Sequence, residues 1–143
     1  MVRVGVAVVL AAIGLAVALV VVPLASAKDI RDALTAPGGG NPFGGAAVGA
    51  YRIHVQGESV RIRASVDLAP SADQVFEGWL VDMQTGYKLS LGLLRGNDLD
   101  FRGRFVNPWT YGVLVITEEP QGDLDPNPAA PVAGALLPAP FGQ

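Results

Sequence analysis

Residues 51–66 read YRIHVQGESVRIRASV, and this stretch decides the fold. Apolar and polar side chains alternate over residues 51–56 and again over residues 60–68, which is the period of a β-strand with one buried face. Between the two runs, Gly57 takes the first position of a two-residue turn, where a positive φ angle is required. The stretch therefore predicts two antiparallel strands joined by a tight hairpin.

Five more short apolar or alternating runs follow, separated by breaks that contain glycine, proline, asparagine or serine. These runs span residues 74–82, 87–94, 99–105, 110–117 and 132–136. Short strands at a spacing of about ten residues, without any helical period, are typical of an antiparallel sandwich. We expect an all-β, immunoglobulin-like β-sandwich of about seven strands.

The predicted core consists of the inward-facing apolar residues of these strands. They are Ile53, Val55, Ile62, Val66, Phe76, Trp79, Val81, Leu91, Leu93, Phe101, Phe105, Val113 and Val115. Phe76 and Trp79 are three residues apart, so a regular strand would place them on opposite faces. A bulge at Gly78 would turn both inward. Without one, either Phe76 or Trp79 is exposed.

The start of the chain has the pattern of an export signal. Arg3 precedes 19 apolar residues, 4–22, and the run is followed by Pro23 and by an Ala-Ser-Ala sequence that ends at Ala27. As a helix the run would be about 28 Å long, close to the thickness of a bilayer's hydrocarbon core, so a retained anchor is the alternative to cleavage after Ala27. Because the cation stays inside, both alternatives place the remainder outside the membrane. We expect a secreted or membrane-anchored protein.

Residues 28–50 are expected to form a flexible linker. Within them, residues 33–50 contain six glycines and two prolines and no charged side chain, a composition that opposes both helix and central strand. The predicted organisation is a signal peptide or anchor over residues 1–27, this linker, and a β-sandwich domain over residues 51–143.

Composition excludes several classes of function. The 116 residues after Ala27 carry nine Lys or Arg and thirteen Asp or Glu, and this acidic excess opposes nucleic-acid binding. The chain has no cysteine, which excludes disulfides, thiol catalysis and a lipid-modified N-terminal cysteine. The domain must therefore be stabilised by packing alone.

The chain offers little catalytic chemistry. His54 is the single histidine and lies on the polar side of its predicted strand, so neither a multi-histidine metal site nor a second histidine for a triad is available. As a general base it would need a partner such as Asp67 or Asp82. We expect no catalytic residue, no metal and no cofactor, and hence no enzyme.

The acidic loop 118–125 contains part of a calcium-binding pattern. Residues 123–127 read DLDPN, which resembles the start of a calcium loop, but Pro128 and Gly134 stand where an EF-hand has Gly and Glu. An EF-hand is excluded. A looser calcium site and a solvated acidic turn remain as alternatives.

Two groups of side chains are candidates for binding. Five arginines alternate with apolar residues on three predicted strands and would line one face of a sheet: Arg52, Arg61, Arg63, Arg102 and Arg104. They would pair with Asp67, Glu77 or Asp100 across strands, or form a cationic docking patch. Trp109 and Tyr111 follow Pro108 at a junction of loop and strand, and form either an exposed protein-contact patch or part of the core.

Residues 68–82 read LAPSADQVFEGWLVD, with Phe76 three residues before Trp79, and this segment resembles the signature strand of the extracytoplasmic, C-terminal domain of anti-sigma-K factors. The likeness covers about residues 60–137. Its other elements are Thr85-Gly86, Ser90-Leu91-Gly92, residues 115–123 with Glu118 and Pro120, and a closing proline-containing strand at residues 128–134. The resemblance implies a β-fold outside the membrane that contacts other proteins, with these motif residues in structural roles.

A typical member of that family carries a sigma-binding domain before its membrane span, often with a His and Cys cluster. Only three residues precede the apolar run here, and cysteine is absent, so we do not expect this chain to sequester a sigma factor directly. We expect a non-enzymatic, envelope-associated domain that acts by protein contacts or by self-association. The alternatives are a surface subunit that assembles by strand addition, using residues 28–50 or the last strand, and a calcium-binding extracellular module.

Overall fold

The computed structural model describes residues 26–40 and 42–143. This part consists of eight strands and one short 3-10 helix: β1 (Lys28–Thr35), β2 (Ala47–Gln56), β3 (Ser59–Val66), β4 (Gln74–Asp82), β5 (Lys88–Leu93), β6 (Asp98–Arg104), η1 (Pro108–Thr110), β7 (Tyr111–Pro120) and β8 (Ala130–Leu136). The prediction of an all-β antiparallel fold is confirmed, and each of the seven predicted strands is present. Gly57 has the expected positive φ, 58°, in the β2–β3 turn.

The predicted signal or anchor segment, residues 1–27, lies outside the described residues except for its last two positions. Within the part of the chain that the structure describes, no helix is long and apolar enough to cross a membrane.

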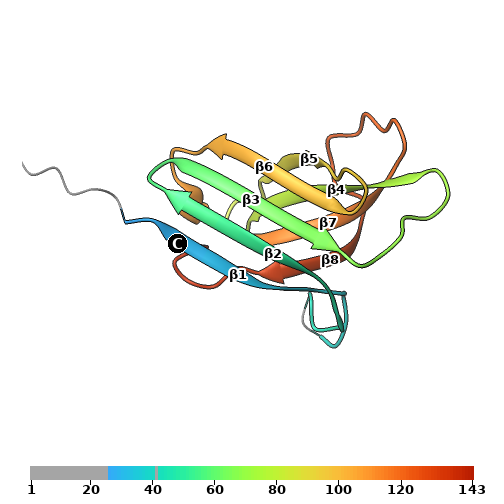
Figure 1. Ribbon diagram of the computed structural model, residues 1–143, viewed down its shortest axis with the longest axis horizontal. Coiled ribbons are helices and arrows are strands. Elements are labelled where there is room, and N and C mark those ends of the chain that lie inside the picture. The colour runs from blue at the N-terminus through green and yellow to red at the C-terminus, as the bar shows by residue number, and fades with distance from the viewer. Residues whose placement is uncertain (1–25, 41) are drawn as a thin grey trace, which may run out of the picture.

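The strands form one antiparallel sheet in the order β5-β4-β7-β8-β1-β2-β3-β6. The sheet folds over into two facing layers, β1-β2-β3-β6 and β5-β4-β7-β8 (Figure 1). The layers are joined where β1 meets β8, through the single pair Thr35 and Gly134. An immunoglobulin sandwich places its third strand in the second sheet, whereas β3 here stays beside β2. The predicted immunoglobulin-like strand order is therefore not found.

The core lies between the two layers and follows the alternation of the strands. Ile53 and Ile62 of the first layer and Leu114 and Ile116 of the second are at most 1% exposed and belong to one cluster. Nine of the thirteen predicted core residues are buried; Val81, Phe101 and Phe105 are half-buried, and Leu93 is exposed.

The exposure of Leu93 has a specific cause in the pairing of β4 with β5. Gly78 pairs with Gly92, and the next residue of β4 pairs with Ser90, so Leu91 is an extra residue and forms a bulge. Gly92 has a φ of 94°, a conformation that favours glycine. The bulge reverses the alternation, so Leu91 points inward and Leu93 outward.

Phe76 and Trp79 lie on opposite faces, so the predicted inward turn of both residues is wrong. Phe76 lies in the main core, 2% exposed, while Trp79 belongs to a second cluster on the outer side of β4 and β7. Trp79 is nevertheless only 3% exposed, because Phe43 from the β1–β2 loop packs against its cluster. Neither of the two sequence-based alternatives for this pair is correct.

The expectation of a flexible linker over residues 28–50 is corrected by the structure. β1 pairs with β2 along its whole length, from Lys28 opposite Val55 to Thr35 opposite Ala47. Leu34 is fully buried and Phe43 covers part of the second layer. The glycine-rich composition obscured a strand because its apolar residues are few.

We predict that Leu34→Ala lowers the free energy of unfolding by about 2–5 kcal/mol, since it removes a fully buried side chain and leaves a cavity. Arg31→Ala, on the same strand and with 71% of its side chain exposed, is the matched control and should change stability by no more than about 0.5 kcal/mol. Urea unfolding followed by tryptophan fluorescence measures both. Equal stability of the two variants would show that β1 is not part of the folded body.

Candidate functional site

The outer side of the first layer is covered by arginine. Because every second residue of β1, β2, β3 and β6 points outward, the strand register brings these side chains into cross-strand rows. Arg52 lies opposite Arg63, and His54 lies opposite Arg61, which in turn lies opposite Arg102. We call this surface the arginine face, defined by Arg31, Arg52, Arg61, Arg63, Arg102 and Arg104.

The prediction that five arginines share one sheet face is confirmed. Arg31 is a sixth member, and it was missed because β1 was not recognised as a strand. Of the three predicted acidic partners only Asp100 belongs to the face. Glu77 instead accepts a hydrogen bond from Ser90 on the second layer, and Asp67 lies beyond the end of β3.

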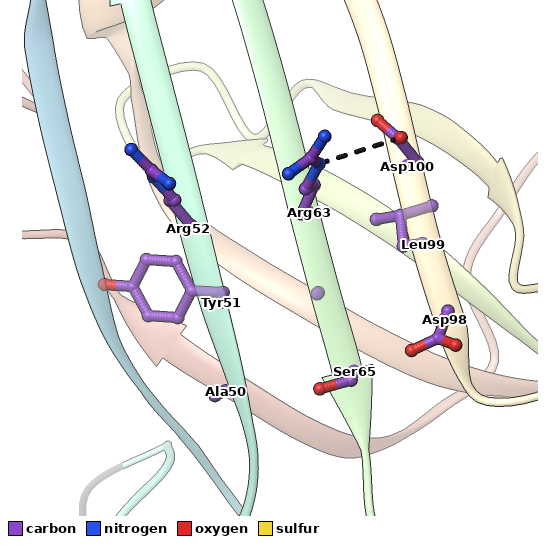
Figure 2. Close-up of a pocket in the computed structure, with 9 residues that line it drawn as sticks. Ala50, Tyr51, Arg52, Arg63, Ser65, Asp98, Leu99 and Asp100 are labelled. Atoms are coloured by element: carbon purple, nitrogen blue, oxygen red, sulfur yellow. Dashed lines mark ion pairs between the residues drawn. The ribbon is translucent and has the colours of Figure 1, made fainter.

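Two aspartates hold the arginine face together. Arg52 donates two hydrogen bonds to the carboxylate of Asp29, at 2.9 and 2.5 Å. Arg61 donates two to Asp100, at 3.1 and 2.8 Å, and the guanidinium of Arg63 lies 3.7 Å from the same carboxylate. Figure 2 shows Arg63 beside Asp100, with Arg52 on the neighbouring strand. Two-point contacts of this kind fix the orientation of both partners.

These contacts shift the pKa values of both carboxyl groups. The hydrogen bonds from Arg52 lower the pKa of Asp29 to about 2, and those from Arg61 lower the pKa of Asp100. Both aspartates are therefore ionised at neutral pH and offset part of the positive charge. Arg63 and Arg102, with 52% and 69% of their side chains exposed, are more weakly engaged.

Shallow hollows lie between the arginine side chains. One of about 260 Å³ is lined by Arg52, His54, Arg61 and Arg63. His54 lies among these cations and opposite Asp29 of β1, whose carboxylate is engaged by Arg52. Asp82, considered as a partner of His54, lies in the second layer and accepts hydrogen bonds from the backbone of Gln84 and Thr85. Neither Asp67, which lies beyond the end of β3, nor Asp82 at the end of β4 belongs to the arginine face.

The predicted aromatic contact residues are half-buried. The ring of Trp109 meets that of Phe141 edge-on at 5.1 Å, and the ring of Tyr111 lies 5.5 Å from that of Phe105. Both Trp109 and Tyr111 pack against the main core. The alternative of burial therefore describes these two side chains better than free exposure does.

The motif residues of the second layer occupy structural positions. The indole of Trp79 donates a hydrogen bond to Thr117 at 2.9 Å, Thr117 donates to the carboxylate of Glu119, and this carboxylate also accepts from the backbone of Ala129. Thr117 and Glu119 are at most 3% exposed. This polar chain fixes the 121–129 loop to β7.

The remaining motif residues also act on the backbone. Gly92 supplies the positive φ beside the extra residue of the β5 bulge. Glu118 accepts a hydrogen bond from the backbone of Ser71, and Pro120 ends β7 opposite Gln74. Glu118 and Pro120 thus hold the start of β4 against the end of β7.

The carboxylates of the acidic loop do not converge on a common point. Asp123 accepts from the backbone of Asp125, and Asp125 accepts from both the backbone and the side chain of Asn127. The latter bonds lower the pKa of Asp125. Within residues 26–40 and 42–143, no group of three or more His, Asp or Glu side chains is placed to hold a metal ion. Asp123 and Asp125 are thus engaged in local turns.

Fold and site together define an all-β domain whose distinctive surface is an ordered array of charge on a sheet. In a comparison with known protein families, residues 1–132 match the family described as anti-sigma-K factor rskA, C-terminal. The chain belongs to this family. No curated protein and no solved structure matches it.

We predict that the pKa of Asp29, measured by carbon NMR of the carboxyl group, is about 2 and rises toward 3.8 in Arg52→Gln. Arg104→Gln, which removes a cation paired with Glu58 instead, is the control and leaves the pKa of Asp29 unchanged. Because a depressed carboxyl pKa stabilises the folded state only above the unfolded value, this contribution is present above pH 3.8 and is lost as the pH falls toward 2. A normal Asp29 pKa in the unmodified protein contradicts the pairing.

We expect the buried polar chain of Trp79, Thr117 and Glu119 to stabilise the folded state. Thr117→Val keeps the shape of the side chain but deprives the Trp79 indole and the Glu119 carboxylate of their shared partner, so unfolding should become easier by about 1–3 kcal/mol. Thr110→Val, whose hydroxyl bonds an exposed backbone carbonyl, is the control and should cost less than about 1 kcal/mol. Thermal unfolding compares them, and equal costs would refute the role given to Thr117.

Proposed function

We infer that this chain is a non-enzymatic domain that works on the outer side of the cell membrane through contacts with other proteins. The extent of the family match carries this proposal. The match begins at residue 1, so the apolar run 4–22 and the β-sheet body belong to one unit of the anti-sigma-K C-terminal family. A cation before such a run and small residues after it are typical of an export signal or anchor. The family description is that of a regulator of another protein.

An apolar rim at one end of the second layer is the surface that best fits protein contacts. It consists of Met83, Tyr87 and Leu136, which are 62%, 57% and 51% exposed. Met83 lies over Gly112 at the start of β7, and Leu136 is the register partner of Val113. Exposed apolar side chains gathered at one place are typical of protein-interaction sites.

The rim adjoins the aromatic residues that the sequence suggested for contact. The backbone carbonyl of Trp109 accepts hydrogen bonds from Gly142 and Gln143, and Tyr111 opens β7 beside Gly112. Gly142 also lies beside Gly112, which Met83 covers, so Trp109 and Tyr111 lie next to the rim, and Met83 and Tyr87 provide its exposed part.

The alternative functions receive less support. For strand addition, both proposed donor segments already have partners in their own sheet, since β1 pairs with β2 and β8 pairs with β7. For calcium binding, Asp123 and Asp125 are engaged in local turns. Neither alternative is favoured over protein contact.

Topology can be tested by labelling intact cells, because the chain has no cysteine of its own. Gln84→Cys places a single thiol in the exposed β4–β5 turn. We predict that a membrane-impermeant maleimide labels this variant in intact cells, in a form that is either membrane-bound or released into the medium.

The matched control is the same variant without residues 4–22, which should remain inside and react only after lysis. Labelling of Gln84→Cys only after lysis, as in the control, would contradict export. N-terminal sequencing of the recovered protein then distinguishes a start at Lys28, which means secretion, from an intact leader, which means a tether.

A further inference from the structure

The charge of the folded body is divided unevenly between its surfaces. Residues 28–143 carry nine Lys or Arg and thirteen Asp or Glu. Six of the nine cations belong to the arginine face, whereas four of the thirteen acids accompany them: Asp29, Asp98 and Asp100 point outward from the same strands, and Glu58 in the β2–β3 turn pairs with Arg104. One face of an otherwise acidic domain is therefore positive.

The shape of this face is that of a plane and not of a cleft. The guanidinium groups are distributed over four neighbouring strands, about 14 Å across at the usual strand spacing. Arg31 and Arg52 belong to β1 and β2, while Arg102 and Arg104 belong to the far edge strand β6. A flat array of separated cations fits an extended layer of anions better than one small anion.

The position of the predicted anchor, the apolar run 4–22, is a second and independent reason to expect a membrane surface next to the arginine face. Only five residues, 23–27, separate the apolar run from β1, and even a fully extended chain of that length spans at most about 17 Å. β1 belongs to the layer that carries the arginine face, and its first residue, Lys28, pairs with Val55 next to His54 (Figure 1). An anchored run would hold this face within reach of the bilayer surface.

We propose that the arginine face binds the anionic headgroups of membrane lipids and lays the first layer against the bilayer, leaving the apolar rim of the second layer free for a protein partner. This inference rests on the proposed export and tethering. The lipid phosphates are the anionic layer that the tether brings closest. Arginine forms two-point hydrogen bonds with phosphate, and cations next to an anionic leaflet each add to binding.

The test uses the full chain reconstituted in vesicles of phosphatidylcholine, either alone or with 30% phosphatidylglycerol. Two single-cysteine variants carry an environment-sensitive fluorophore: Ser59→Cys on the exposed outer side of β3, within the arginine face, and Lys88→Cys on the outer side of the second layer. Quenching by aqueous iodide reports whether each label is covered. We expect the label at position 59 to be protected at least two-fold in the anionic vesicles only, and the label at position 88 to remain accessible in both.

Variants with a matched change of charge locate the charge responsible. Arg63→Gln with Arg102→Gln removes two weakly engaged cations of the face and keeps the Arg61–Asp100 pair, whereas Lys88→Glu lowers the charge by the same two units on the outer side of the second layer. In the Ser59→Cys background the first variant should weaken the face contact about thirty-fold, and the second should leave it unchanged. Salt at about 0.5 M should abolish the protection in all of them, because surface charges are then screened.

The possible outcomes distinguish failure of the membrane tether from failure of lipid binding by the arginine face. If the chain floats with both kinds of vesicle and position 59 is equally quenched in both, the tether stands and the lipid-binding face is refuted, which leaves an acidic protein as the partner of the arginines. Equal effects of the two charge variants refute it as well. If the chain floats with neither kind of vesicle, both the tether and the face are refuted.

Discussion

The structure depends on one constraint, the strict alternation of side chains in the first layer. Ile53 directly follows Arg52, and Ile62 directly follows Arg61, so the same strands supply both the core and the charged face. A slip of one residue between β2 and β3 would bury guanidinium groups and expose the isoleucines. The cost of burying unpaired charge is what fixes the register, and the register in turn builds the arginine rows.

The alternation made the general architecture predictable. Seven strands, the antiparallel pairing, the turn at Gly57 and most of the core follow from apolar spacing and turn residues alone. The prediction failed where another segment supplies what the local sequence lacks. β1 contains only two buried apolar residues, Ile30 and Leu34, and it is held by pairing with β2, which no local pattern reveals. Trp79 faces outward as regular spacing requires, but Phe43 from a distant loop buries it.

The arginines of the candidate site were also predictable from the alternation, whereas their acidic partner was not. Five of the six arginines could be assigned to one face, because strand period depends only on sequence. Their partner could not be selected among Asp67, Glu77 and Asp100, since that choice depends on which strands are neighbours. Pairing β3 with β6, instead of with a strand of the other layer, is a consequence of the global topology.

The two layers divide the roles of a domain in the anti-sigma-K C-terminal family. The first layer presents charge, and the second presents the buried polar chain of Trp79 and Thr117 and an exposed apolar rim. The register of the first layer can be measured directly through nuclear Overhauser contacts across its strands. With the register described above, we predict contacts from Ile62 to Ile53 on one side and to Phe101 on the other. Contacts from Ile62 to Arg52 or Arg102 as direct partners would mean a register shifted by one residue and would contradict it.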